Sequence, residues 1–177
     1  VELNRKLGAM PLVGGNSAHL HADYAESLAS MTEALAGAQK YVHAEFYILA
    51  LDQTTAPFFD ALQAAAARGV TVRVLLDHIA SLRSPGYHRT IRRLKRMGVE
   101  WHLMLPVQPL RGRFQRPDLR NHRKLLVIDG RIAYTGSQNM VDSSYNKRSN
   151  RRRNLRWKDL MVRFEGPIVR GINALFV

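Results

Sequence analysis

Hydrophobic residues repeat along the chain at two different periods, and each period predicts one kind of element. Apolar side chains three or four positions apart predict a helix over 23–36, with a stripe formed by Tyr24, Leu28, Met31 and Leu35. Asp23 and Glu26 have the spacing of a capping pattern at the start of this helix. The same period predicts two further helices, which cover 55–69 and 91–98.

Shorter apolar runs, rich in β-branched residues, predict strands between and after these helices. The predicted strands cover 41–49, 70–77, 99–105, 124–128, 131–135 and 159–164. Asp129-Gly130 is typical of a tight hairpin turn between two of them. Two short runs around 13–17 predict another hairpin with a Gly-Gly-Asn turn, and Gly166-Pro167 predicts the start of a last helix.

Strands and helices alternate through the first part of the chain with short connections that end in glycine, which is typical of a parallel α/β sheet. The later strands are joined by hairpins instead. We therefore expect an α/β fold with one mixed β-sheet and helices on both faces. The length of 177 residues, of which 46% are hydrophobic, suits a single domain over 1–177.

The amino-acid composition excludes several kinds of functional site. The chain has no cysteine, which excludes disulfides, cysteine-ligated zinc sites and thiol nucleophiles. No apolar run is as long as a membrane-spanning helix requires. Because the chain begins with Val1 and ends within an apolar pattern, we expect it to be part of a longer protein.

Positive charge is concentrated in two segments of a chain whose net charge is +13. Residues 111–124 hold six cations against one acid, and 147–158 hold seven cations and no acid. The segments belong to predicted basic loops over 107–121, which we expect to be mobile, and 143–158. Such segments favour a polyanionic partner, either lipid headgroups or nucleic acid, although 147–158 alone could be a solvated loop.

Candidate catalytic residues lie on both sides of the predicted Asp129-Gly130 turn. His122 and Lys124 are two apart on a strand, so their side chains point to the same face. The hairpin returns the chain near them, which brings Ser137 and Asn139 to the same place. An imidazole beside three hydrogen-bond donors suits a phosphodiester, because the donors hold the oxygens while His122 attacks phosphorus.

These residues carry a resemblance. The pattern His122-x-Lys124-x4-Asp129-x6-Gly136-Ser137-x-Asn139 resembles the HKD motif of the phospholipase D superfamily. Further segments are similar to the first catalytic domain of bacterial cardiolipin synthases: 4–7, 10–16, 45–48, 69–77, 135–139, 159–163 and 165–167. The resemblance covers essentially the whole chain and implies one half of a phospholipase D-like fold.

The resemblance implies a role for each motif residue and no metal or cofactor. His122 would become a covalent phosphohistidine, Lys124 would neutralise phosphate charge, and Ser137 and Asn139 would hold phosphate oxygens. Asp159 matches the family's acid that orients the histidine. Asp129 completes the catalytic motif, where the family gives it a structural or charge-balancing role. Its hairpin position likewise favours a turn residue.

The resemblance also implies an activity and partners. Displacement at phosphorus by this route uses two histidines, so a second motif is expected either downstream in the same protein or in a homodimer partner. The implied reaction joins two phosphatidylglycerol molecules into cardiolipin and releases glycerol, at a bacterial cell membrane and on its cytoplasmic face. One alternative is a homodimeric single-motif phosphodiesterase or endonuclease that binds nucleic acid. Another is a non-catalytic domain that binds anionic membranes.

Two other polar features are less specific. His19 and His21 are two apart, but no third ligand is in view, so zinc binding is not predicted. Glu45 lies in an otherwise apolar predicted strand. It is either an acid of the pocket or a buried structural partner.

Overall fold

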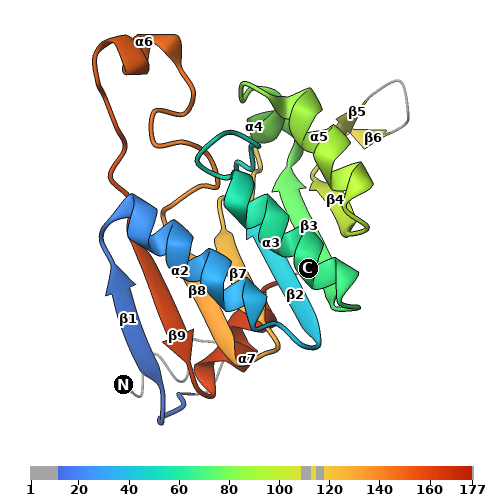
Figure 1. Cartoon of the computed structure of the whole chain (residues 1–177), viewed down its shortest axis with the longest axis vertical. Helices are drawn as coiled ribbons and strands as arrows, with labels where there is room; N and C mark the ends of the chain where they lie inside the picture. The colour runs from blue at the N-terminus through green and yellow to red at the C-terminus, as the bar shows by residue number, and fades with distance from the viewer. Residues whose placement is uncertain (1–11, 109–112, 115–117, 177) are drawn as a thin grey trace.

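The computed structural model describes residues 12–108, 113–114 and 118–176 (Figure 1). Within them, seven strands form one mixed sheet in the order β1-β9-β8-β7-β2-β3-β4. The β2–β3 and β3–β4 pairs are parallel, and the other neighbours are antiparallel. The strands are β1 (Ser17–His21), β2 (Tyr41–Phe46), β3 (Thr71–Asp77), β4 (Glu100–Met104), β7 (Lys124–Ile128), β8 (Ile132–Gly136) and β9 (Met161–Glu165).

Helices lie on both faces of this sheet (Figure 1). The described helices are α2 (Tyr24–Ala36), α3 (Ala56–Ala67), α4 (His78–Leu82), α5 (Tyr87–Arg96), α6 (Arg148–Arg152) and α7 (Ile168–Asn173). Side chains of α2, α3 and α5 share one apolar core with the sheet, and α7 packs on the opposite face. The predicted α/β class, with a mixed sheet between helices, is confirmed. None of the described helices has the length and hydropathy needed to cross a membrane.

Because side chains alternate between the two faces along each strand, the sheet has a separate hydrophobic core on each face. On β7, Leu126 and Ile128 belong to the core under α2 and α3, whereas Leu125 and Val127 pack with Val169 of α7. All five residues of β7 are buried. This strand therefore lies at the centre of the sheet and is packed on both faces.

Local signals explain the elements that border the candidate site. The Asp23 side chain accepts a hydrogen bond from the backbone N–H of Glu26 at 2.9 Å, which caps α2. Asp129 and Gly130 both have positive φ, 55° and 63°, and the Arg131 N–H donates to the Ile128 carbonyl. These are the features of the tight turn predicted between β7 and β8.

The predicted hairpin at 13–17 is wrong. β1 pairs with β9, and Asn16 serves another element, because its Oδ1 accepts from the Ile168 N–H at the start of α7. Gly166 comes so close to this segment that a Cβ would lie 2.5 Å from the Gly15 carbonyl oxygen. The absence of a side chain at Gly166, and not the Gly-Gly-Asn sequence, thus allows the two distant segments to approach closely.

The two basic loops contain more secondary structure than predicted. Val107–Gln108 (β5) pairs with Arg113–Phe114 (β6), so part of 107–121 is a small sheet. The helix α6 lies within 143–158. α4 was not predicted either, and the Asp77 side chain caps it by accepting from the Ala80 N–H at 2.8 Å. Residues 4–7 and 10–11, quoted for the resemblance, lie outside the described residues.

Candidate active site

The centre of the candidate site is a contact between His122 and Lys124 at the start of β7. Lys124 Nζ lies 2.9 Å from His122 Nδ1 and donates to the His122 carbonyl oxygen at 2.7 Å. Since β7 is antiparallel to β2 and Lys124 pairs with Phe46, the residue after β2, Tyr47, also reaches this place. Its ring meets the imidazole edge-on, with 4.3 Å between centroids, and lies 5.3 Å from Lys124 Nζ.

Burial differs sharply between the two motif residues. His122 is exposed, whereas Lys124 is only 2% exposed. Burial lowers the pKa of Lys124 to about 8, and the Asp159 carboxylate opposes this shift. Partial burial, and then the charge of Lys124, hold the pKa of His122 below its usual value. A neutral imidazole beside a desolvated cation can act as a nucleophile toward an anionic phosphorus centre.

A second pair, Ser137 and Asp159, joins the ends of β8 and β9. Ser137 Oγ donates to Asp159 Oδ1 at 2.8 Å and accepts from the Leu160 N–H at 3.1 Å. Asp159 Oδ2 is buried and accepts no hydrogen bond within the described part of the chain. The hydrogen bond of Asp159 thus runs to Ser137, and its influence on Lys124 is electrostatic. No bond between Asp159 and His122 is present among the described residues.

Gly136 allows β8 and β9 to approach closely just before Ser137. A Cβ at this position would collide with the carbonyl oxygen of Leu160 and lie 2.9 Å from the Cα of Met161. Only glycine fits without displacement of the backbone. The motif glycine is therefore a packing requirement that brings Ser137 to Asp159.

Asn139 links the segment after β2 to the basic loop. Its side chain is 4% exposed, its Oδ1 accepts from the Ile48 N–H at 3.0 Å, and its Nδ2 donates to Tyr145 Oη at 2.9 Å. The neighbouring Gln138 is fully buried and bonds to Ser27 of α2. Among the bonds of the described residues, one Nδ2–H group donates to Tyr145, so the Asn139 amide retains a second donor. Sequence patterns did not point to Tyr145; Tyr47 lay within a segment quoted for the resemblance.

Asp129 lies at the far end of β7 from Lys124. Its carboxylate accepts hydrogen bonds from the backbone N–H groups of Gln39, Lys40 and Tyr41 at 2.7–2.9 Å. Although burial alone would raise the pKa of Asp129, these three donors hold it below the usual value. The structure thus places Asp129 apart from the other motif residues, as the anchor of a turn.

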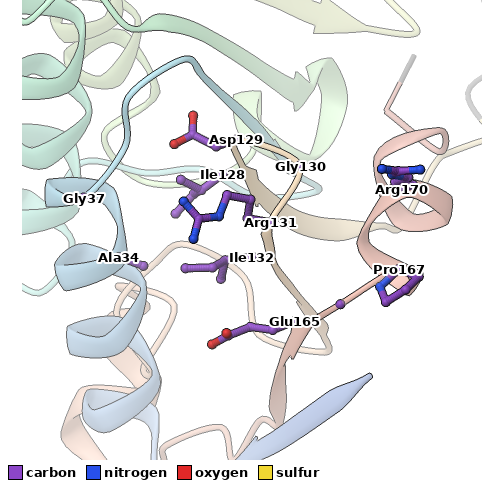
Figure 2. Close-up of a pocket in the computed structure, with 11 residues that line it drawn as sticks. Ala34, Gly37, Ile128, Asp129, Gly130, Arg131, Ile132, Glu165, Pro167 and Arg170 are labelled. Atoms are coloured by element: carbon purple, nitrogen blue, oxygen red, sulfur yellow. The ribbon is translucent and has the colours of Figure 1, made fainter. Parts of the chain in front are cut away.

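A hollow of about 590 Å³ opens beside this turn (Figure 2). Figure 2 shows Arg131 and Glu165 at its wall, with Arg170 of α7 to one side. The length of β7 separates this hollow from His122 and Lys124. It is therefore not part of the candidate phosphate site.

Glu45 is a buried partner that positions the segment before His122. It is 1% exposed, and its Oε1 accepts from Asn121 Nδ2 at 2.6 Å. Burial raises its pKa, while the Arg123 charge and the Asn121 hydrogen bond oppose the shift. Asn121 Oδ1 in turn accepts from the Arg123 N–H, so Glu45 fixes the backbone on both sides of His122. Of the two roles left open by the sequence, the contacts favour the structural one.

The basic loop that contains α6 projects beyond the end of the sheet, at the top of Figure 1. Every residue from 151 to 158 is exposed, including Leu155 at 51% and Trp157 at 59%. The Arg151 guanidinium donates to the side chains of two other residues of the loop, to Asn146 Oδ1 at 2.5 Å and to Ser144 Oγ at 3.4 Å. The loop therefore presents cations and large apolar side chains together, and Arg151 helps to hold its shape.

The mixed sheet, with a His-x-Lys pair at the start of its central strand, is that of a phospholipase D-like domain. A family model described as "Cardiolipin synthase, PLD-like domain" matches residues 31–162, and the chain belongs to this family.

Individual proteins agree with this assignment. The chain is 34% identical to cardiolipin synthase A of Pectobacterium carotovorum over 93% of its length and 33% of that protein's. It is also 34% identical to cardiolipin synthase A of Proteus mirabilis, over 99% of its length and 35% of that protein's. The chain thus spans about a third of these relatives. In fold it is similar to Nuc from Salmonella typhimurium, a phospholipase D family member, with a TM-score of 0.67, 14% identity and 91% of each chain covered.

Proposed function

We propose that the protein to which this domain belongs transfers a phosphatidyl group between two phosphatidylglycerol molecules, which yields cardiolipin and glycerol. The observation that carries the proposal is the contact between the exposed imidazole of His122 and the buried ammonium of Lys124. It occurs in a chain that is 34% identical to cardiolipin synthases. The residues invoked below need no metal ion.

The chemistry takes two displacements at one phosphorus atom. A nitrogen of His122 attacks the phosphodiester, a P–N bond forms, and the P–O bond to the glycerol headgroup breaks. A second histidine protonates the departing alkoxide and then removes a proton from the hydroxyl of the second phosphatidylglycerol. That hydroxyl attacks phosphorus, and the P–N bond breaks. The second histidine comes from another motif in the longer protein or from a second copy of the domain.

Lys124 and Asp159 divide the supporting roles. In the folded domain a charged Lys124 donates to Nδ1, which leaves the imidazole proton on Nε2. Attack through Nε2 therefore requires the proton to move from Nε2 to Nδ1 and the ring to turn, so that the new Nδ1–H is donated to a carboxylate. Asp159 Oδ2, buried and without a hydrogen bond in the described part of the chain, is the acceptor we propose. Lys124 is then free to bind phosphate oxygens, together with Asn139 and with Ser137, whose hydroxyl would turn its proton from Asp159 Oδ1 to the phosphate.

The basic loop would place the site at an anionic membrane. Cations near such a surface contribute on the order of 1 kcal/mol each. The exposed Leu155 and Trp157 add apolar groups that suit the headgroup boundary. We therefore propose that the loop contacts the cytoplasmic face of the cell membrane and brings His122 within reach of lipid headgroups.

The test of the chemistry uses the full-length protein with His122→Ala. His122 is exposed, so the fold should be retained, and conversion of phosphatidylglycerol to cardiolipin in vesicles should fall by at least about 10³-fold. His88→Ala, at another exposed histidine on α5, is the matched control. Substantial cardiolipin formation by His122→Ala would overturn the nucleophile assignment. Cleavage of nucleic acid by dimers of this domain would move the alternative phosphodiesterase function ahead.

The test of the membrane contact replaces Arg148, Arg152 and Arg153 by serine and leaves Arg151 to hold the loop. Co-sedimentation with phosphatidylglycerol vesicles should weaken and should lose much of its salt dependence, while turnover of a soluble short-chain diester should persist. The matched control removes the same charge from α5, at Arg92, Lys95 and Arg96. Equal losses in both variants would mean that net charge alone drives binding. Vesicle binding without any turnover by the parent protein would favour the non-catalytic alternative.

A further inference from the structure

A group of three potential metal ligands lies where the edge strand β1 meets the start of α2. His19 and His21 project from the same face of β1, and Glu26 stands in the first turn of α2. Glu26 Oε1 is 2.9 Å from His21 Nδ1 and 3.9 Å from His19 Nε2. One ligand atom from each of the three side chains lies within 4.8 Å of the other two.

We propose that His19, His21 and Glu26 bind one divalent transition-metal ion of the zinc type. Two imidazoles and a carboxylate are a ligand set that Zn²⁺ accepts, with bonds of about 2.0–2.2 Å. Ligand atoms around a tetrahedral ion are then about 3.3 Å apart. The observed separations of 2.9 and 3.9 Å bracket this value, so small side-chain rotations would complete the geometry.

The conformation of Glu26 supports a role beyond helix capping. Asp23 caps α2 by accepting from the Glu26 N–H, which is one half of a capping box. In a complete box the acid at this position would reach back to the backbone of the cap residue. The Glu26 carboxylate instead faces the two histidines. The cap fixes where α2 begins and hence where this carboxylate stands.

The burial of His21 is a second, independent observation. Its side chain is 6% exposed, and Nε2 is buried with no hydrogen-bond partner among the described residues. A buried imidazole with one unpartnered nitrogen is costly when hydrogen bonding is its only interaction. An ion bound at Nδ1, the nitrogen that faces Glu26, would add a strong interaction to this buried ring, while Nε2 would stay as it is.

The charges around the three side chains and the space beside them are compatible with a bound cation. Arg163 of β9 pairs with His19 across the sheet, but its guanidinium is engaged by Glu165 at 2.6 Å. As metal ligands the two imidazoles would be neutral, and with the Glu26 carboxylate they would give the ion a ligand set of charge −1. A hollow of about 320 Å³ beside the histidines leaves room for water as a further ligand. Sequence inspection missed the third ligand because Glu26 belongs to the next element.

This proposal is independent of the proposed phosphatidyl transfer. β9 and β8 lie between β1 and β7 in the sheet, so the ion would be remote from His122 and Lys124. Its effect would be to tie the edge strand to α2. Removal of the ion should therefore lower thermal stability and leave the chemistry at His122 unaffected.

The experiment titrates the tag-free, chelator-treated 177-residue chain with Zn²⁺ in a calorimeter and with Co²⁺ in an absorption spectrometer. We expect one ion per chain, a dissociation constant of about 1 µM or tighter, and a visible Co²⁺ band typical of four ligands. His19→Ala and Glu26→Gln alter exposed side chains, so both variants should fold, and each should weaken binding at least about 10-fold. His88→Ala and Glu33→Gln are matched controls on exposed positions of α5 and α2.

Two results would overturn the proposal. One is the absence of saturable Zn²⁺ binding to the wild-type chain. The other is binding that His19→Ala and Glu26→Gln leave unchanged, which would place the ion at other histidines. Loss of Zn²⁺ affinity in these two variants alone, together with a melting temperature that rises with Zn²⁺ only in the wild type and the controls, would support it.

Discussion

Replacing Lys124 by methionine should change how the stability of the domain depends on pH. The ammonium is 2% exposed, and burial lowers its pKa from the usual 10.5 to about 8. Between these two values the unfolded chain binds more protons than the folded chain, so stability rises with pH across this window. At neutral pH the charged folded form carries an unfavourable contribution of ~3 kcal/mol. About 2 kcal/mol of this is regained between about pH 7 and about pH 9.5.

The assay is urea unfolding followed by circular dichroism at several pH values, with linear extrapolation to water. The free energy of unfolding of Lys124→Met, relative to the wild type, should fall by ~2 kcal/mol as the pH rises across this range. Taking the difference cancels the titration of other lysines and tyrosines. Lys95→Met, at an exposed lysine of α5, should show a constant difference. A constant difference for Lys124→Met as well would refute the argument that burial perturbs this group.

Two further predictions concern the β7–β8 hairpin. Gly136→Ala should cost about 1–3 kcal/mol or more, because the added Cβ meets the β9 backbone; thermal unfolding checks this against Gly14→Ala, where a Cβ meets nothing within 4 Å. Asp129→Asn should lower stability at neutral pH by about 1–2 kcal/mol, since the neutral amide accepts the three backbone N–H groups less strongly. Because the folded pKa of Asp129 is depressed, its contribution is present at neutral pH and is lost as the pH falls below the usual 3.8. An acid titration of the melting temperature should therefore be flatter for Asp129→Asn, and unchanged curves would contradict the anchoring role.

Much of the fold could be predicted from local patterns. The helices α2, α3 and α5 have periodic apolar stripes, and β7, the β7–β8 turn and β8 follow from β-branched runs around Asp129-Gly130. The failures depend on distant contacts. Gly15 and Asn16 form no hairpin because Gly166 and Ile168 engage them from the other end of the chain. No local pattern in 13–17 carries that information.

The candidate site likewise contains some contacts that local patterns predict and others that depend on distant segments. The contact of His122 with Lys124 follows from the two-residue period of a strand, which the sequence displays directly. Partners from other elements could not be placed: Tyr47 follows β2, Tyr145 lies in the basic loop, and Glu26 completes the His19–His21 cluster from α2. The burial that perturbs Lys124 was also invisible, because it depends on how the ends of three strands pack.

The hairpin of β7 and β8 has a consequence for which lengths of this segment can be tolerated. Lys124 and Gly136 stand at its open end, and the number of residues in each arm determines which face every side chain occupies. Deleting one residue from the β7 arm would turn Lys124 toward the side where Val127 packs on α7. Deleting two would restore the face but shift the arm by about 7 Å, beyond the reach of a hydrogen bond. Replacement of one apolar residue by another within the arms should therefore be tolerated more readily than a change in the length of either arm.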